Sequence, residues 1–122
     1  MIDLSASSPG AVHVLEDDPG VSDSLRFLLQ ALGYEVRLHP DAESFFENPP
    51  PRPQDVVIVD LGLPGISGAQ TIRWITSLRE PPRVIAITGQ SQKAIDDEMR
   101  DIVGPHHLLR KPLSGERLVA VL

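Results

Sequence analysis

The sequence predicts an α/β fold in which a parallel, doubly wound sheet of five strands alternates with five helices. Short apolar runs alternate along the chain with segments whose apolar residues recur at helical spacing. Residues 56–59 and 84–87 are continuously apolar, which is typical of strands buried on both faces of a parallel sheet. The chain has 122 residues, 41% of them hydrophobic, which is enough for one domain with its own core.

The five expected strands come from the apolar runs. The second run alternates apolar and charged side chains, as a half-exposed strand near a sheet edge does. Acids follow the first run and end the third, and a threonine ends the fourth. The expected strands are residues 12–15, 34–38, 56–60, 84–88 and 108–109.

The five helices are expected from apolar residues at a 3.6-residue period, and their ends carry residues that commonly start or stop helices. Asp41 and Ser114 are expected N-caps, Gly33 a C-terminal cap, and residues 104–105 the end of an acidic fourth helix. The last helix has about two turns before the chain ends, fewer than an average helix. We therefore expect a mobile leader at residues 1–10 and a folded domain at 11–122 that is a fragment of a longer protein.

Composition excludes several classes of function. A net charge of −6 argues against binding of nucleic-acid phosphates by this domain. The absence of cysteine excludes disulfides and thiolate chemistry, and it agrees weakly with a reducing compartment. The sequence has no apolar stretch of about 20 residues and no recognisable signal peptide, so we expect a cytoplasmic protein without membrane contact.

Three acids are expected to meet at one edge of the sheet. In the flavodoxin-like strand order 2-1-3-4-5, the carboxyl ends of strands one and three are neighbours, and they carry Glu16, Asp17 and Asp60. Carboxylates about 5 Å apart repel by about 3 kcal/mol per pair at an effective dielectric constant near 20. A divalent cation relieves this repulsion, and oxygen ligands favour Mg²⁺. Lys111 and Thr88 end neighbouring strands, so the set suits phosphoryl transfer to a carboxylate.

In sequence and order these residues resemble the receiver domains of two-component response regulators. The resemblance covers residues 12–122. Each matching piece is short, but their order at successive strand ends makes the resemblance specific. The pieces are Glu16-Asp17, Asp60-Leu61-Gly62-Leu63-Pro64 with Gly68, Thr88-Gly89, and Lys111-Pro112.

The resemblance implies a role for each residue of the site. Asp60 is expected to accept a phosphoryl group from a histidine kinase or a small phosphodonor, with Mg²⁺ held by Glu16, Asp17, Asp60 and the backbone carbonyl of Gly62. Lys111 is expected to pair with the phosphoryl oxygens or with Asp60, and the Lys111–Pro112 peptide bond to be cis. Thr88 is expected to turn inward to the phosphoryl group.

The expected function is therefore a phosphorelay switch rather than a metabolic enzyme. Its only chemistry is self-phosphorylation and self-dephosphorylation. It controls an attached or partner output, for which a helix-turn-helix domain beyond residue 122 is the candidate. The resemblance also leaves open a phosphorylation-dependent homodimer through the last two helices.

Leu108 departs from the family pattern. Many receivers carry Tyr or Phe three residues before the lysine, and an aliphatic side chain cannot report the switch by the same ring rotation. An alternative is thus a receiver-like interaction module that works without phosphorylation. A phosphohydrolase of the haloacid type is disfavoured, because it needs an aspartate where this chain has Gly62.

Simpler interpretations apply to several other polar residues. Asp17 or Asp18 alone could cap the first helix. We expect the histidines to be exposed residues rather than metal ligands, and the acidic residues 96–98 to be a solvated helix face. The histidines are His13, His39, His106 and His107.

Overall fold

The sheet has five parallel strands in the order β2-β1-β3-β4-β5, in a computed structural model that describes residues 10–102 and 106–122. The prediction of a doubly wound sheet in this order is confirmed. No helix in the described part of the chain is long and apolar enough to cross a membrane. The strands are β1 (Val12–Leu15), β2 (Val36–His39), β3 (Val56–Asp60), β4 (Arg83–Thr88) and β5 (His107–Arg110).

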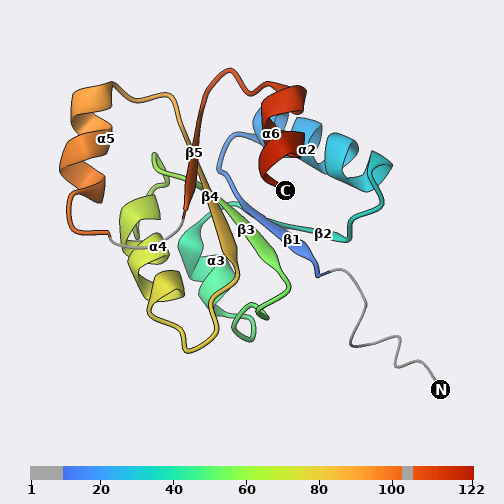
Figure 1. The fold of residues 1–122 in the computed structure, drawn as a ribbon, viewed down its shortest axis with the longest axis horizontal. Coiled ribbons are helices and arrows are strands. Elements are labelled where there is room, and N and C mark those ends of the chain that lie inside the picture. Colours follow the sequence, from blue (N-terminus) through green and yellow to red (C-terminus); the bar gives the residue numbers. More distant parts are fainter. Residues whose placement is uncertain (1–9, 103–105) are drawn as a thin grey trace.

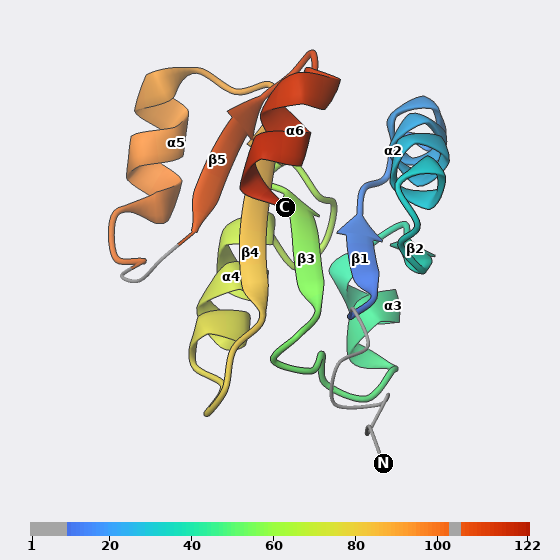
Figure 2. The ribbon, with the colours of Figure 1, turned by 45° about the vertical axis from the view of Figure 1, so that its right-hand side comes forward.

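The helices cover both faces of the sheet. Two helices, α2 (Pro19–Ala31) and α6 (Gly115–Val121), lie on one face (Figure 1). Three helices, α3 (Ala42–Phe46), α4 (Gly68–Thr76) and α5 (Gln92–Met99), lie on the other, as the turned view in Figure 2 also shows. Each crossover between neighbouring parallel strands therefore runs through a helix, as parallel pairing requires.

Alternate residues of β3 belong to two separate cores. Val57 and Val59 pack with residues of α3, α4 and α5, whereas Ile58 packs with residues of α2 and α6. All three side chains are fully buried. Burial on both faces explains why the strand is a continuous apolar run, and it holds Asp60 at the strand's carboxyl end.

Each helix begins at a side chain that accepts a backbone N–H from its first turn. The predicted caps Asp41 and Ser114 are confirmed, and Ser67 forms a capping box with Gln70. Gly33 follows α2 with φ of 93°, a conformation that favours glycine. The five N-caps are Asp18, Asp41, Ser67, Ser91 and Ser114.

Most strand boundaries agree with the prediction to within one residue, and two boundaries differ by more. The second strand begins at Val36 rather than at Tyr34, because the Tyr34 N–H donates to the Leu29 carbonyl at the end of α2. The fourth helix ends at Met99, earlier than the sequence predicts. The expected end of that helix, residues 104–105, lies outside the described residues. Of the leader expected at residues 1–10, only Gly10 is described, and it is buried.

The exposed environment expected for His13 and His39 is wrong. Both lie in strands and are buried, with 4% and 8% of their surface exposed. His13 Nε2 lies 3.1 Å from Asp55 Oδ2, and the rings of His13 and His39 are stacked with centroids 5.9 Å apart. The edge of Phe45 completes this histidine cluster. A buried carboxylate thus compensates for burying a polar ring.

Candidate functional site

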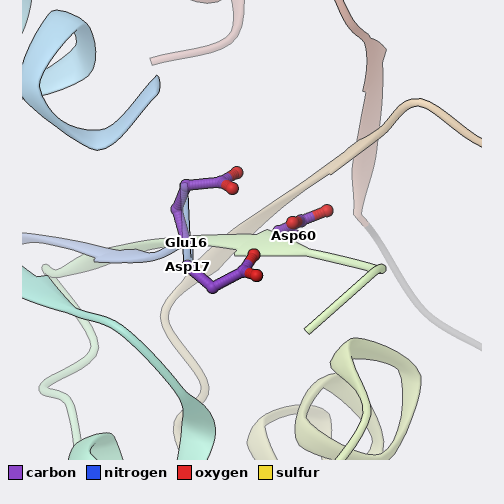
Figure 3. A group of neighbouring side chains, drawn as sticks. All are labelled: Glu16, Asp17 and Asp60. Atoms are coloured by element: carbon purple, nitrogen blue, oxygen red, sulfur yellow. The ribbon is translucent and has the colours of Figure 1, made fainter. Parts of the chain in front are cut away.

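Three carboxylates meet at the carboxyl ends of β1 and β3. Because Leu15 pairs with Val59, the residues that follow them, Glu16 and Asp60, lie side by side. One carboxylate oxygen from each of Glu16, Asp17 and Asp60 lies within 4.8 Å of the other two. Figure 3 shows the three side chains turned toward a common space. Glu16 and Asp60 are buried and Asp17 is exposed, so the acidic cluster is open on one side.

Lys111 brings a positive charge to the acidic cluster. Its Nζ lies 3.0 Å from Glu16 Oε2 and 3.4 Å from Asp60 Oδ2. Its backbone N–H donates to the Thr88 carbonyl at 2.8 Å, which continues the pairing of β5 with β4 beyond the end of β5. The Lys111–Pro112 peptide bond is cis, as predicted. The sequence therefore identified the cation that faces the acids.

The cluster and the lysine influence each other's protonation. Burial raises the pKa of the Glu16 carboxyl, and the Asp60 charge adds to this effect, while the ion pair with Lys111 opposes it. Burial by itself lowers the pKa of Lys111, but pairing with Glu16 and with Asp60 outweighs burial and raises that pKa. Lys111 is therefore charged at neutral pH. One cation faces three closely spaced acids, an arrangement that a further, divalent cation stabilises.

Thr88 lies at the same edge as Asp60. Asp60 pairs with Ile87, so Thr88 extends one residue beyond it at the end of β4. Thr88 is fully buried, and its hydroxyl accepts a hydrogen bond from the Gln90 N–H at 2.9 Å. Gly89 leaves open space, because a Cβ there would meet Lys111 Cδ only at 4.0 Å. In this conformation the Thr88 hydroxyl is held by the loop that follows it.

The turn after β3 orients the Asp60 carboxylate. The Gly62 N–H donates to Asp60 Oδ1 at 3.0 Å. Gly65 has φ of 71°, which explains a glycine there. Gly68, the first residue of α4, touches the backbone of Asp60, since a Cβ at this position would lie 2.4 Å from the Asp60 carbonyl oxygen. The role of the Gly62 carbonyl as a metal ligand stays a prediction.

Asp18 and Asp17 have different surroundings, although either could cap a helix. Asp18 is the N-cap of α2, and its Oδ1 accepts the Gly20 N–H at 2.9 Å. The Asp18 N–H in turn donates to Glu16 Oε1 at 3.1 Å. Capping thus belongs to Asp18, which leaves Asp17 in the acidic cluster.

The donor set fits Mg²⁺. It consists of carboxylate oxygens, which are the hard ligands that Mg²⁺ prefers, and the exposure of Asp17 leaves the cluster accessible to water. Glu16, Asp17 and Asp60 are the residues that could hold the ion. Their mutual repulsion gives a physical reason for cation binding.

Sequence reasoning missed Gln90 near the site. It also expected Glu98 to lie on a solvated helix face, whereas Glu98 is half-buried and its Oε2 atom is buried. Gln90 contacts the Thr88 hydroxyl, and its side-chain Nε2 donates to Glu98 Oε1 on α5 at 3.1 Å. The only signal in the sequence is a polar residue two positions after the end of a strand, which is too common to be informative. Leu108, by contrast, lies on β5 with 37% of its surface exposed.

A doubly wound sheet with an acidic cluster and a lysine at its carboxyl edge defines the class of receiver-like signalling domains. The chain matches the family model of the response regulator receiver domain over residues 12–122. It therefore belongs to that family, and the resemblance seen in the sequence is confirmed. Members of this family act in two-component systems.

The chain is also similar in sequence to a curated transcriptional regulator. The chain is 28% identical over 116 residues to the transcriptional regulatory protein FixJ of Bradyrhizobium diazoefficiens, a match that covers 95% of this chain and 56% of that protein. The chain spans about half the length of the curated relatives that it matches.

Solved structures share the fold. A CheY-like response regulator receiver domain from Methanospirillum hungatei superposes with a TM-score of 0.80 at 21% identity, covering 93% of this chain and 90% of that one. The receiver domain of a sensor histidine kinase from Pseudomonas aeruginosa gives 0.79 at 23% identity, covering 93% and 94%. At these identities the similarity establishes the fold alone.

Proposed function

We propose that Asp60 accepts a phosphoryl group from a histidine kinase or a small phosphodonor, and that the domain changes conformation in response. The observation that carries this proposal is the convergence of Glu16, Asp17 and Asp60, with Lys111 within 3.4 Å of the Asp60 carboxylate. The family membership supports it. In the Pseudomonas aeruginosa receiver domain, which shares the fold, a magnesium ion is coordinated in the active-site cleft.

The proposed chemistry follows from the position of each side chain. Glu16, Asp17, Asp60 and the Gly62 carbonyl would hold Mg²⁺, which would supply positive charge to the phosphoryl oxygens. An Asp60 carboxylate oxygen attacks phosphorus and forms an acyl phosphate, while the bond from phosphorus to the donor nitrogen or oxygen breaks. Lys111 exchanges its ion pair with Asp60 for one with a phosphoryl oxygen.

The Thr88 hydroxyl completes the proposed site. It turns from the loop toward the phosphoryl group, to which it donates a hydrogen bond. The product is a modified switch rather than a released metabolite, so the proposed role is signalling. Hydrolysis of the acyl phosphate in the same site resets the switch.

We also propose that the domain controls an output in the whole protein. The FixJ relative is named a transcriptional regulatory protein and is longer than the matched part. A DNA-binding output, such as a helix-turn-helix domain beyond residue 122, agrees with that name. The net charge of −6 argues against contact of this domain itself with nucleic acid. A phosphorylation-dependent homodimer is one means of controlling such an output.

Phosphorylation tests the proposal directly. Incubation with acetyl phosphate and Mg²⁺ is expected to add one phosphoryl group per chain by intact-protein mass spectrometry. Asp60→Asn is expected to add none, because an amide is a poor nucleophile, and chelation of Mg²⁺ is expected to suppress the reaction in the wild type. The matched control is Asp23→Asn, which changes an exposed acid on α2.

Two outcomes contradict the proposal. One is stoichiometric phosphorylation of Asp60→Asn. The other is a wild-type pocket that takes up neither acetyl phosphate nor beryllofluoride, which would favour the interaction module that works without phosphorylation.

A further inference from the structure

In this chain it is not evident how a change at Thr88 alters the surface of the domain. Leu108, on β5, is aliphatic and 37% exposed, so no aromatic ring at this position can turn inward behind Thr88. The hydrogen bonds of the described residues show a different connection. It runs from Thr88 through Gln90 to α5.

Gln90 contacts the Thr88 hydroxyl through two of its groups. Its backbone N–H donates to Thr88 Oγ1 at 2.9 Å, and its side-chain Oε1 lies 3.5 Å from the same hydroxyl, at the outer limit of a hydrogen bond. The other end of the side-chain amide, Nε2, donates to Glu98 Oε1 at 3.1 Å. One amide thus joins a buried hydroxyl at the site to a carboxylate on α5.

The connection follows from the direction of helical side chains. Side chains on a helix point toward its N-terminus, so Glu98 near the end of α5 reaches back toward Gln90, which precedes the N-cap Ser91. The Gln90 backbone is held from the other side, because Arg110 on β5 donates to the Gln90 carbonyl at 3.1 Å. Movement of the Thr88 side chain therefore acts on Gln90, whose own side chain is hydrogen-bonded to α5.

Helix α5 is loosely held by packing, so the hydrogen bonds at its two ends are important. Near its start Arg110 on β5 donates to the Gln92 side chain, and near its end Gln90 donates to Glu98. Ile95 is the only buried residue of α5 among those described. Its far end is bound to α4 by Arg73, which donates to the Glu98 carbonyl at 3.0 Å and to the Asp101 carboxylate at 2.7 Å. Elements with few buried contacts are displaced at low free-energy cost.

We propose that Gln90 couples the Thr88 hydroxyl to α5 through its hydrogen bond to Glu98, and that this link carries the signal that an aromatic residue carries in other receivers. When the hydroxyl turns toward a phosphoryl group, Gln90 loses its partner at Thr88 and its amide rearranges, so the bond to Glu98 and the position of α5 change. Gln90 is a positioning residue, because it acts through Thr88. The inference rests on the proposed phosphorylation of Asp60.

The test uses beryllofluoride with Mg²⁺ as a phosphoryl mimic and reads two signals. Fluorine NMR measures binding, and the backbone amide shifts of residues 92–99 measure the response of α5. We expect Gln90→Ala and Glu98→Ala to bind beryllofluoride with an affinity within about twofold of the wild type. In both variants the change in the amide shifts of residues 92–99 on binding is expected to be smaller by about threefold or more, because one hydrogen bond is removed.

Two further variants separate the link from a structural effect. Glu98→Gln is expected to keep the α5 response that Glu98→Ala loses, because its amide oxygen still accepts a hydrogen bond from Gln90. Asp97→Ala, an exposed acid on the same helix, is expected to leave the response unchanged. In the wild type, beryllofluoride is also expected to increase hydrogen exchange at the Gln90 N–H, since that group loses its acceptor.

The outcomes distinguish the two proposals. An unchanged α5 response in both alanine variants overturns the coupling, and so does an unchanged exchange rate at the Gln90 N–H when beryllofluoride is bound. Failure of the wild type to bind beryllofluoride overturns the phosphorylation of Asp60 and the coupling together. That failure is seen in the fluorine spectrum, independently of α5.

Discussion

At the scale of single residues, Gly68 shows how the turn after β3 supports the candidate site. A Cβ at this position would lie 2.4 Å from the Asp60 carbonyl oxygen and 2.7 Å from the Leu61 Cα. Helix α4 thus begins in direct contact with the backbone that carries the Asp60 side chain. Backbone atoms cannot move aside as a flexible side chain can, so only glycine permits this approach.

We expect Gly68→Ala to destabilise the domain, although alanine is usually the better helix residue by about 1 kcal/mol. Overpacking costs about 1–3 kcal/mol, and here the added methyl group would press on backbone atoms, which cannot move aside easily. Urea unfolding is therefore expected to show a free energy of unfolding that is lower by about 1 kcal/mol or more. Beryllofluoride affinity is expected to fall as well, because the Asp60 backbone must shift.

The control for this substitution is Gly115→Ala, where a Cβ would meet Leu28 Cδ2 at an ordinary 3.7 Å. Its free energy of unfolding is expected to stay the same or rise. A gain of stability in Gly68→Ala would show that the close contact relaxes freely.

At the scale of elements, the start of α2 assigns two adjacent acids to different roles. Asp18 accepts N–H groups of the first turn, whereas Asp17 extends toward Glu16 and Asp60. We expect Asp18→Ala to lower the free energy of unfolding by about 1 kcal/mol, the usual value of an N-cap, and to leave beryllofluoride binding intact. Urea unfolding and fluorine NMR measure the two effects.

Asp17→Asn is expected to show the opposite pattern. Removing one charge from the acidic cluster lessens repulsion, so stability is unchanged or higher, while the requirement for Mg²⁺ in beryllofluoride binding shifts to higher concentration. If Asp17→Asn unfolds more easily than Asp18→Ala, then Asp17 rather than Asp18 stabilises the start of α2.

The elements could be predicted from sequence because they depend on short-range patterns, and the acidic cluster could be predicted because alternating strands and helices allow few strand orders. Apolar runs and caps identify strands and helices, and strand order then brings Glu16 next to Asp60. The boundary of β2 could not be predicted, because it depends on a hydrogen bond from Tyr34 to the end of α2. The pairing of His13 with Asp55, which is 42 residues distant, and the link from Gln90 to α5 depend on side-chain directions that no local pattern encodes.

At the scale of the whole molecule, the histidine cluster joins β1, β2, α3 and the loop before β3. Burial, together with the neighbouring His13, lowers the pKa of His39 to about 4 from the usual 6.5. Among the described residues, its buried Nε2 has no hydrogen-bond partner. Burial opposes ionisation of Asp55, but hydrogen bonds from the Arg52 N–H and from His13 outweigh it and lower the Asp55 pKa.

These shifts predict that acid destabilises the domain in two stages. Below pH 6.5 the unfolded chain protonates His39 while the folded chain does not, so the stability that is complete above pH 6.5 is lost as the pH falls to about 4. This loss amounts to about 3.5 kcal/mol at most, at about 1.4 kcal/mol per pH unit. Protonation of Asp55 adds a second loss at still lower pH, as the pH falls through its lowered folded pKa.

His39→Phe is expected to remove the first stage, because phenylalanine keeps a ring against His13 and Phe45 without a titrating group. Urea unfolding between pH 7 and pH 4 should then show a shallower decline than in the wild type. Changing the exposed His107 to Gln serves as the control and should leave the wild-type slope unchanged. An identical slope in His39→Phe and the wild type would mean that other groups cause the acid sensitivity, since the free energy that separates the two profiles comes from the His39 proton alone.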